Sequence, residues 1–222
     1  MYLQNTEQFI LIYVHVFLAL NMDRQINNML RNMRRINLVY QESFKCYPPV
    51  FADITQQKRE KIENGGKILM PPSSLERLLR FNSGSPMMFK ASKGVDSPKC
   101  THCGVLEFTA DEGEVLFPEW MMDNLGVEYG DEITLRNVTL PIGSYVKFQP
   151  ENDSFLKIDD QKAVLETALR DFSCLTKGDK VAVFYNDVQY NLFVKELKPA
   201  DAVNIVECDL HLDIEAPEGY KE

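Results

Sequence analysis

The sequence has few of the features that mark several large classes of protein. It contains no long run of lysine and arginine, and its formal net charge of −9 does not predict binding to the phosphates of nucleic acid. It holds only 5 cysteines, an odd number with irregular spacing, which does not fit the disulfide framework of a small secreted protein. Its 222 residues are 45% hydrophobic, so the chain can build a sizeable core.

Sequence motifs of common enzyme classes are also missing. No glycine-rich stretch is followed by the lysine and helix of a phosphate-binding loop, and no Gly-x-Ser-x-Gly elbow occurs. An aspartic protease needs Asp-Thr/Ser-Gly, and the nearest match, at residues 82–84, has asparagine in place of the acid. Of the 3 histidines, only His102 could act in catalysis, and we interpret it as structural. We therefore do not expect an enzyme.

The start of the chain differs from the rest by a continuous apolar run at residues 9–20. A helix that crosses a bilayer needs about 20 apolar residues, so this run is too short to span one. Its length suits the core of a signal peptide, although Glu7 and no basic residue precede it. The acid-poor stretch that follows, residues 21–37, contains several arginines and is similar to a transit leader. We interpret residues 1–38 as a targeting leader, a disordered tail, or a misplaced start before Met22.

From residue 39 onward, short strand-like runs alternate with turns, which is typical of an α+β fold that is mostly β. Residues 52–66 are polar and end in two glycines, so we predict a loop there. Helices are predicted where apolar residues recur at helical spacing beside helix start or stop signals. These are residues 73–81, 118–125 and 162–172.

Two segments of the chain resemble each other. Residues 127–133 read VEYGDEI and residues 175–181 read LTKGDKV, and each lies between a predicted helix and a predicted strand. The shared Gly-Asp pair suits a tight turn, because glycine tolerates unusual backbone angles and aspartate hydrogen-bonds its own backbone. A polar stretch that contains proline, residues 149–153, separates the two copies. We therefore predict two β-rich subdomains, at residues 39–149 and 150–222.

Cysteine spacing suggests a zinc site, with Cys100 and Cys103 as one pair of ligands and Cys208 and His211 as the other. Zinc ligands must converge at about 2.0–2.3 Å from one point, whereas successive side chains of a strand point to opposite faces. Strict alternation over residues 204–214 predicts a strand, with Cys208 in the core and His211 in solvent. We therefore predict no metal and no cofactor, and we interpret Cys103 and Cys208 as buried apolar residues.

Several longer motifs occur in a fixed order along the chain. They are NGGKILMPPSSL at 64–75, THCGVLEF at 101–108, PEWMM at 118–122, KAVLETALRDF at 162–172, ECD at 207–209 and DIEAPEGYKE at 213–222. Together they resemble the ubiquitin fusion degradation protein family over about residues 40–222. The resemblance implies a double-psi β-barrel followed by a small β/α roll, and a non-enzymatic adaptor.

The resemblance also implies partners and a location. The adaptor would bind ubiquitin and ubiquitin chains, pair with the nuclear-protein-localisation partner subunit, and deliver clients to the valosin-containing-protein AAA ATPase for proteasomal degradation. It would act in the cytoplasm and nucleus, and at the cytosolic face of the endoplasmic reticulum. In the family, the segments that bind the partner subunit and the ATPase lie beyond the point that corresponds to Glu222, which puts ATPase recruitment in doubt.

Two alternatives to this adaptor stay open at the level of sequence. A leader at residues 1–38 would suit a copy that serves protein import across the membrane of a complex plastid. A barrel of this class could also be a structural or lipid-binding adaptor that does not bind ubiquitin.

For the binding surface, we predict residues beside the expected boundary between the subdomains, because clefts between domains commonly bind ligands. The acidic body of the chain suits a basic partner. The alternative is that the aromatic residues only hold the two subdomains together. The predicted ubiquitin- or partner-binding residues are Tyr145, Phe148, Gln149, Pro150 and Phe155.

Overall fold

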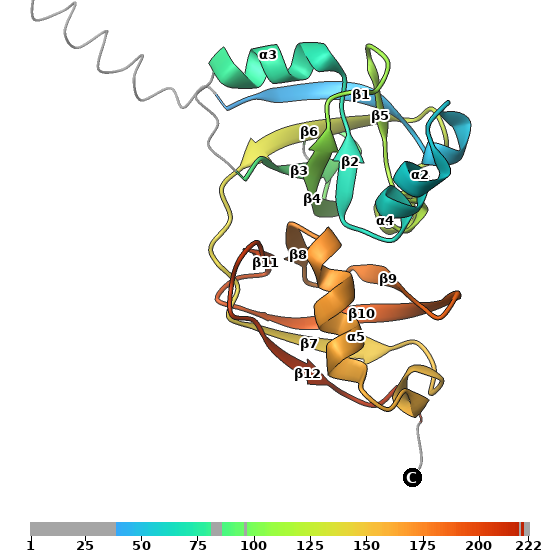
Figure 1. The fold of residues 1–222 in the computed structure, drawn as a ribbon. Helices are drawn as coiled ribbons and strands as arrows, with labels where there is room; N and C mark the ends of the chain where they lie inside the picture. The colour runs from blue at the N-terminus through green and yellow to red at the C-terminus, as the bar shows by residue number, and fades with distance from the viewer. Residues whose placement is uncertain (1–38, 81–85, 96, 218, 220–222) are drawn as a thin grey trace, which may run out of the picture. The chain divides into compact units, whose positions relative to one another are not determined.

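The computed structural model describes residues 39–80, 86–95, 97–217 and 219. The leader or tail predicted for residues 1–38 lies outside these ranges. The described residues form an α+β fold that is mostly β, as the sequence predicts (Figure 1). Within them, no helix combines the length and the apolar character that crossing a membrane requires.

Six strands close into a barrel, in the order β1-β5-β2-β4-β3-β6 (Figure 1). Their bounds are β1 (Gln41–Tyr47), β2 (Lys67–Leu69), β3 (Met88–Ser92), β4 (Cys100–Glu107), β5 (Glu114–Leu116) and β6 (Glu132–Val138). Strand directions are mixed, since β1 runs parallel to β5 and antiparallel to β6. Closure pairs the two sides of each strand and so removes free sheet edges. The double-psi connection within this barrel stays a prediction.

Short helices lie between the barrel strands: η1 (Pro49–Phe51), α2 (Gln56–Glu63), α3 (Pro72–Arg80) and α4 (Glu119–Leu125). Two of the predicted helices, α3 and α4, are confirmed, and Gly126 ends α4 in the left-handed conformation at φ 65°. The loop predicted for residues 52–66 is wrong, because α2 forms within it. The side chain of Thr55 caps α2 by accepting a hydrogen bond from the backbone N–H of Lys58, and only Ile62 is buried.

A second sheet follows, with four strands in the order β12-β7-β10-β9 (Figure 1). Their bounds are β7 (Tyr145–Pro150), β9 (Lys180–Tyr185), β10 (Val188–Lys198) and β12 (His211–Ile214). The helix α5 (Gln161–Ala168) packs on this sheet through Val164 and Leu165, with η2 (Phe155–Lys157) before it and η3 (Leu169–Asp171) after it. Two further strands, β8 (Cys174–Thr176) and β11 (Ala202–Asn204), pair with each other.

The change from the barrel to the second sheet falls between Val138, the end of β6, and Tyr145, the start of β7. Strand β7 pairs with β10 and β12, although the predicted subdomain 39–149 would place most of it with the barrel. The polar stretch at residues 149–153, which the sequence predicts as the boundary, begins within β7. The chain leaves the barrel earlier, in the short connection of residues 139–144 that precedes β7.

The two matching Gly-Asp segments form the tight turns that the sequence predicts. Gly130 has φ 84° and Gly178 has φ 91°, and both values lie in the left-handed region that favours glycine. The first turn lies between α4 and β6, and the second lies between β8 and β9. The first turn therefore leads into β6 of the barrel, and the second leads into β9 of the second sheet.

One hydrophobic core extends through the barrel and under the second sheet. Trp120 of α4 and Phe172 meet with ring centroids 5.8 Å apart, and the indole N–H donates to the carbonyl of Gly65 at 3.0 Å. Gly66 lies so close to Phe172 that a Cβ there would be 2.5 Å from the ring. Segments on both sides of the β6–β7 connection are thus packed into a single body.

The continuous strand predicted for residues 204–214 is wrong. Strand β11 ends at Asn204 and β12 begins at His211, with a turn between them in which Glu207 has φ 50°. The side chain of Asn204 accepts a hydrogen bond from the backbone N–H of Val206 at 2.9 Å, a local bond that competes with strand pairing. Cys208 is therefore partly exposed instead of buried in the core.

Cys103 is fully buried on β4, as the sequence predicts, and Cys100 on the same strand is partly buried. Because the two residues lie on an extended strand, they do not form the turn of a zinc knuckle. The described part of the chain contains no group of three or more histidine, cysteine or acidic side chains able to hold a metal ion.

Candidate functional site

Four of the five predicted binding residues lie on β7, where alternate side chains point to opposite faces of the sheet. Tyr145 and Gln149 share one face with Lys147. Phe148 lies on the other face, where it is fully buried in the core. The fifth residue, Phe155, is also buried, and its ring packs against Tyr190 at a centroid distance of 5.4 Å. A partner therefore reaches neither phenylalanine in the folded chain.

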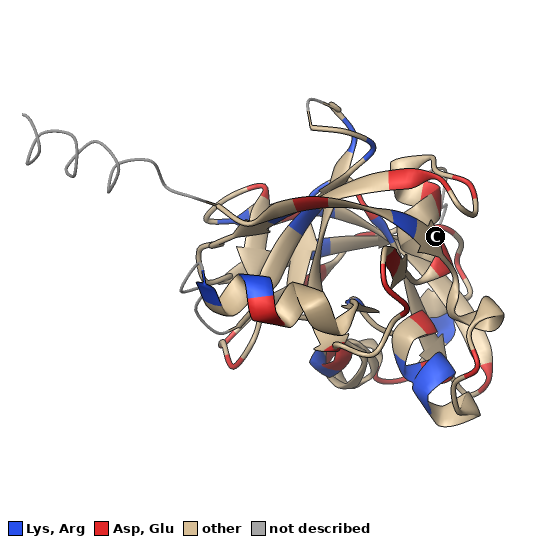
Figure 2. Cartoon of the chain, turned by 90° about the horizontal axis from the view of Figure 1, so that it is seen from above, with Lys and Arg blue, Asp and Glu red and all other residues tan. Residues whose placement is uncertain are grey.

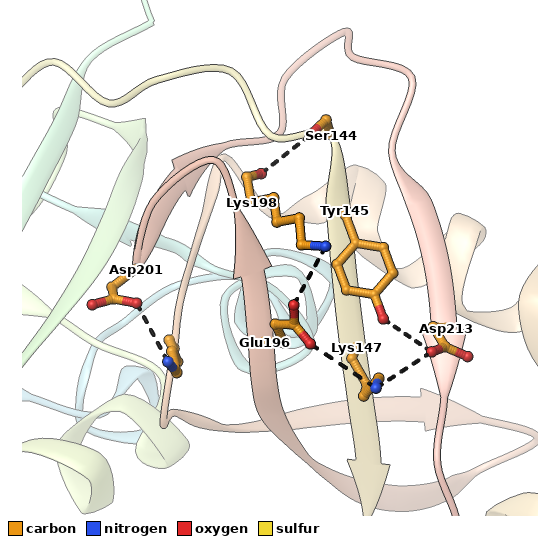
Figure 3. Close-up of polar contacts among 8 residues, drawn as sticks. Ser144, Tyr145, Lys147, Glu196, Lys198, Asp201 and Asp213 are labelled. Atoms are coloured by element: carbon orange, nitrogen blue, oxygen red, sulfur yellow. Dashed lines mark hydrogen bonds and ion pairs between the residues drawn. The ribbon is translucent and has the colours of Figure 1, made fainter.

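The face of the sheet that carries Tyr145 holds a network of charged side chains (Figure 3). The hydroxyl of Tyr145 donates to Oδ2 of Asp213 at 2.9 Å. Lys147 lies between two acids, with its Nζ 3.7 Å from Asp213 and 4.0 Å from Glu196. Lys198 approaches Glu196 at 3.5 Å. We call these five residues, which come from β7, β10 and β12, the Tyr145 face.

The ring of Tyr145 is held from both sides. It stacks on His211 with centroids 5.8 Å apart and planes at 20°, and Nζ of Lys198 lies 4.8 Å from the ring centroid. Loss of water around the phenol and its hydrogen bond to Asp213 raise the pKa of Tyr145. The same hydrogen bond lowers the pKa of Asp213. The ring is thus a fixed aromatic surface with a polar tip.

At the other end of β7, Gln149 and Pro150 line a cavity of about 470 Å³ together with Lys177, Phe193 and Lys195. The side-chain amide of Gln149 donates to the carbonyl of Ala216 at 3.1 Å, which leaves it little freedom to bind a ligand. Tyr145, which is partly exposed, and Gln149, which is buried, share one face of β7 but lie four positions apart instead of converging on one pocket.

The chemistry of the Tyr145 face favours docking over catalysis. Its ammonium groups and carboxylates are paired with each other, and the imidazole of His211 stacks on the ring of Tyr145. Lysine and arginine alternate with acidic residues over the described strands and helices (Figure 2). Aromatic residues are enriched in protein–protein interfaces, and the rims of these interfaces are polar.

Sequence reasoning missed a buried polar cluster where β4 meets the segment β8–β9. The hydroxyl of Thr101 donates to Oδ2 of Asp179. Burial raises the pKa of Asp179 from its ordinary value of 3.8 to about 7, although hydrogen bonds from Thr101 and Thr176 partly oppose the shift. The sequence marked Asp179 as a turn residue, but nothing local indicated that its carboxyl would be buried.

His102 belongs to the same cluster. Its backbone N–H and its ring Nδ1 both lie 3.0 Å from the hydroxyl oxygen of Thr176. Burial, with a smaller contribution from the charge of Lys90, lowers the pKa of His102 to about 4. The imidazole is therefore neutral at pH 7 and held in place, which agrees with the interpretation of His102 as structural.

Two family models match adjoining parts of the chain, which together span residues 40–217. One is described as ubiquitin fusion degradation protein UFD1, N-terminal subdomain 1, and matches residues 40–141. The other is N-terminal subdomain 2 of the same protein and matches residues 142–217. The chain belongs to the ubiquitin fusion degradation protein family. The two family subdomains meet just before β7, where the barrel gives way to the second sheet.

Curated relatives in this family are similar over most of the chain. "Ubiquitin recognition factor in ER-associated degradation protein 1" of Homo sapiens is 52% identical over 164 residues, which cover 74% of this chain and 53% of the relative. The "Ubiquitin fusion degradation protein 1 homolog" of Caenorhabditis elegans is 45% identical over 184 residues, with coverage of 82% and 54%. "Ubiquitin fusion degradation protein 1" of Saccharomyces cerevisiae is 38% identical over 186 residues, with coverage of 82% and 51%. The chain spans about half the length of these relatives.

Proposed function

We propose that this chain is a non-enzymatic adaptor that binds ubiquitin and ubiquitin chains in protein degradation. The observation that carries the proposal is membership of the ubiquitin fusion degradation protein family over residues 40–217. Relatives named as ubiquitin recognition factors in ER-associated degradation, at 52% identity, support it further. The absence of the enzyme motifs considered above is consistent with a binding role.

The finer parts of the proposal concern the partners and the place of action. The adaptor would work beside the nuclear-protein-localisation partner subunit and pass ubiquitinated clients to the valosin-containing-protein AAA ATPase. It would do so at the cytosolic face of the endoplasmic reticulum, in the cytoplasm and in the nucleus. The names of two relatives, which refer to ER-associated degradation, support a role in that process.

We place the ubiquitin contact on the Tyr145 face. A rigid aromatic ring costs little conformational entropy when it is buried in an interface, and tyrosine is enriched among the residues that dominate binding energy. The surrounding acids, Asp213 and Glu196, suit a basic partner surface, although Lys147 and Lys198 partly neutralise them.

An NMR titration of the isotope-labelled chain with ubiquitin and with a lysine-48-linked chain tests the proposal. We expect saturable shifts in one contiguous surface that includes Tyr145 and Lys147. Tyr145→Ala should weaken binding at least several-fold. The control is Tyr185→Ala, which removes a tyrosine on β9 that is 38% exposed and should leave binding unchanged. A dissociation constant of about 1 mM corresponds to a binding free energy near −4 kcal/mol. If no resonance shifts when ubiquitin is added up to about 1 mM, the ubiquitin proposal fails.

A further inference from the structure

A second surface with the character of a binding site lies on the barrel. It is a groove of about 560 Å³ beside η1, and all the residues that line it come from the barrel part of the chain. Its floor is apolar and belongs to a small satellite core, separate from the main one. The floor residues are Tyr47, Ala52, Ile54, Ala110 and Leu116. We call this surface the Phe51 groove.

The rim of the Phe51 groove exposes aromatic side chains. Phe51 is 64% exposed and Tyr129 is 54% exposed, and their rings meet edge to face with centroids 5.3 Å apart. The neighbouring Val50 is 56% exposed. The hydroxyl of Tyr129 donates to Oε1 of Glu119 at 2.8 Å, which fixes the direction of the ring. Two large apolar side chains are thus held in solvent beside a hollow with an apolar floor, an arrangement that marks interaction sites.

The charged residues that line the groove are all acidic, and one cation lies beside it, since Nζ of Lys58 donates to Oγ1 of the lining residue Thr109 at 3.1 Å. Asp53, Asp111 and Glu114 line it, and none of the described lining residues is lysine or arginine. No ion pair joins any of these three carboxylates to another described residue. On the rim, the hydrogen bond to Glu119 and the negative charge of Glu119 raise the pKa of Tyr129.

We infer that the Phe51 groove binds a segment of a partner protein in which a large apolar side chain is flanked by lysine or arginine. The apolar floor and the two rim rings would bury the apolar anchor. The unpaired carboxylates would attract the flanking cations and exclude acidic segments. This surface shares no residue with the Tyr145 face, so the inference goes beyond the proposed ubiquitin contact.

Fluorescence polarisation with a labelled peptide tests the inference on the full chain. The probe is acetyl-KRLFRK-amide, and the comparison peptides are acetyl-EDLFDE-amide, with reversed charge, and acetyl-KRSSRK-amide, without the apolar anchor. We expect saturable binding of the first peptide only. Its affinity should fall when NaCl is raised from about 50 to about 500 mM, because exposed charges are screened over a few ångströms at high salt.

Variants of the protein then locate the site. Phe51→Ala and Tyr129→Ala should each weaken binding of the probe about tenfold or more, the loss expected of an interface hot spot. The pair Asp53→Asn and Asp111→Asn should weaken binding and flatten its salt dependence. The matched controls are Ile142→Ala, at a residue that is 67% exposed, and Glu76→Gln on the exposed side of α3, and neither should change affinity.

Several results would overturn the inference. The first is binding of the acidic peptide with the same affinity as the basic probe, and the second is an unchanged affinity of Phe51→Ala for the probe. The third is a change of oligomeric state in Phe51→Ala, which would make the groove a contact between copies of this chain. Competition by free ubiquitin would also overturn it, since ubiquitin would then occupy the groove. Phe51→Ala should keep its response to ubiquitin, so failure here is distinct from failure of the proposed function. The anchor-free peptide tests the same contact on unaltered protein, whatever Phe51→Ala does to folding.

Discussion

Replacement of Asp179 by asparagine should remove a pH dependence of folding stability that originates in the buried cluster between β4 and β8. Asp179 is only 6% exposed, and burial raises its pKa from 3.8 to about 7. At about 1.36 kcal/mol per pH unit, that difference corresponds to about 4 kcal/mol of folding free energy. Asparagine keeps the acceptor for the Thr101 hydroxyl and has nearly the same shape, so it changes the charge with little change in packing.

The sign follows from the direction of the shift. Below about pH 4 the carboxyl of Asp179 is protonated in both the folded and the unfolded chain, and the stability is fully present. Between about pH 4 and pH 7 the unfolded chain ionises first, which favours unfolding. The stability is therefore lost as the pH rises through about 7, and about 3 kcal/mol of the loss falls between pH 5 and pH 8.

The effect of His102 on folding stability changes with pH in the opposite direction to that of Asp179. The pH dependence of the wild-type chain alone therefore does not isolate the contribution of Asp179. Burial lowers its pKa from 6.5 to about 4, so the unfolded chain takes up the proton first when the pH falls. Folding stability from His102 is present above about pH 6.5 and is lost as the pH falls toward 4. The two effects partly cancel in the wild-type chain, and only a comparison with Asp179→Asn isolates the carboxyl.

Urea unfolding at pH 5 and at pH 8, followed by circular dichroism, measures the effect. The difference in unfolding free energy between wild type and Asp179→Asn should change by about 3 kcal/mol between the two pH values. The variant should gain stability relative to wild type when the pH is raised from 5 to 8. Asp159→Asn, at an exposed residue, is the control and should leave the pH dependence as it is. If Asp179→Asn changes stability equally at both pH values, the carboxyl does not stay neutral in the folded chain and the reasoning is refuted.

Two further substitutions test the packing where the barrel meets the second half of the chain. Gly104→Ala should destabilise the fold by about 1–3 kcal/mol in urea unfolding, because the added Cβ would lie 2.1 Å from Oγ of Ser173. Adding Ser173→Gly should recover part of this loss of stability. If it recovers none, the clash with Ser173 is not the cause. Trp120→Phe should lower the folding stability by about 1–3 kcal/mol, because it leaves the buried carbonyl of Gly65 without its 3.0 Å hydrogen bond. Thermal melting followed by circular dichroism measures this loss, and an unchanged melting temperature would contradict the prediction.

The elements that sequence reasoning placed well are those with strong local signals. Helix α4 lies between Pro118 and Gly126, and both residues act on their own backbone conformation. The Gly-Asp turns at Gly130 and Gly178 are local for the same reason. Helix α2 was missed because it is almost entirely polar and buries only Ile62, so it has no apolar periodicity to detect.

The candidate site shows a different limit. The period of two along β7 implies that Tyr145 and Phe148 face opposite sides, and the structure leaves Tyr145 partly exposed while it buries Phe148. Cys208 was misplaced because apolar and polar residues continue to alternate through a turn that Asn204 stabilises. The Phe51 groove had no signal in the sequence, since Phe51 and Tyr129 are far apart in the chain and meet only in the fold.

The sequence by itself determined the family, the predominance of β structure, two of the barrel helices and the tight turns, because each depends on residues that are neighbours in the chain or on an ordered set of motifs. Only the tertiary structure decided that β7 belongs to the second sheet, that the Phe51 groove exists and that Asp179 is buried against Thr101, 78 positions away. Such features depend on which distant segments pack together, and burial then sets the exposure of a ring and the pKa of an acid.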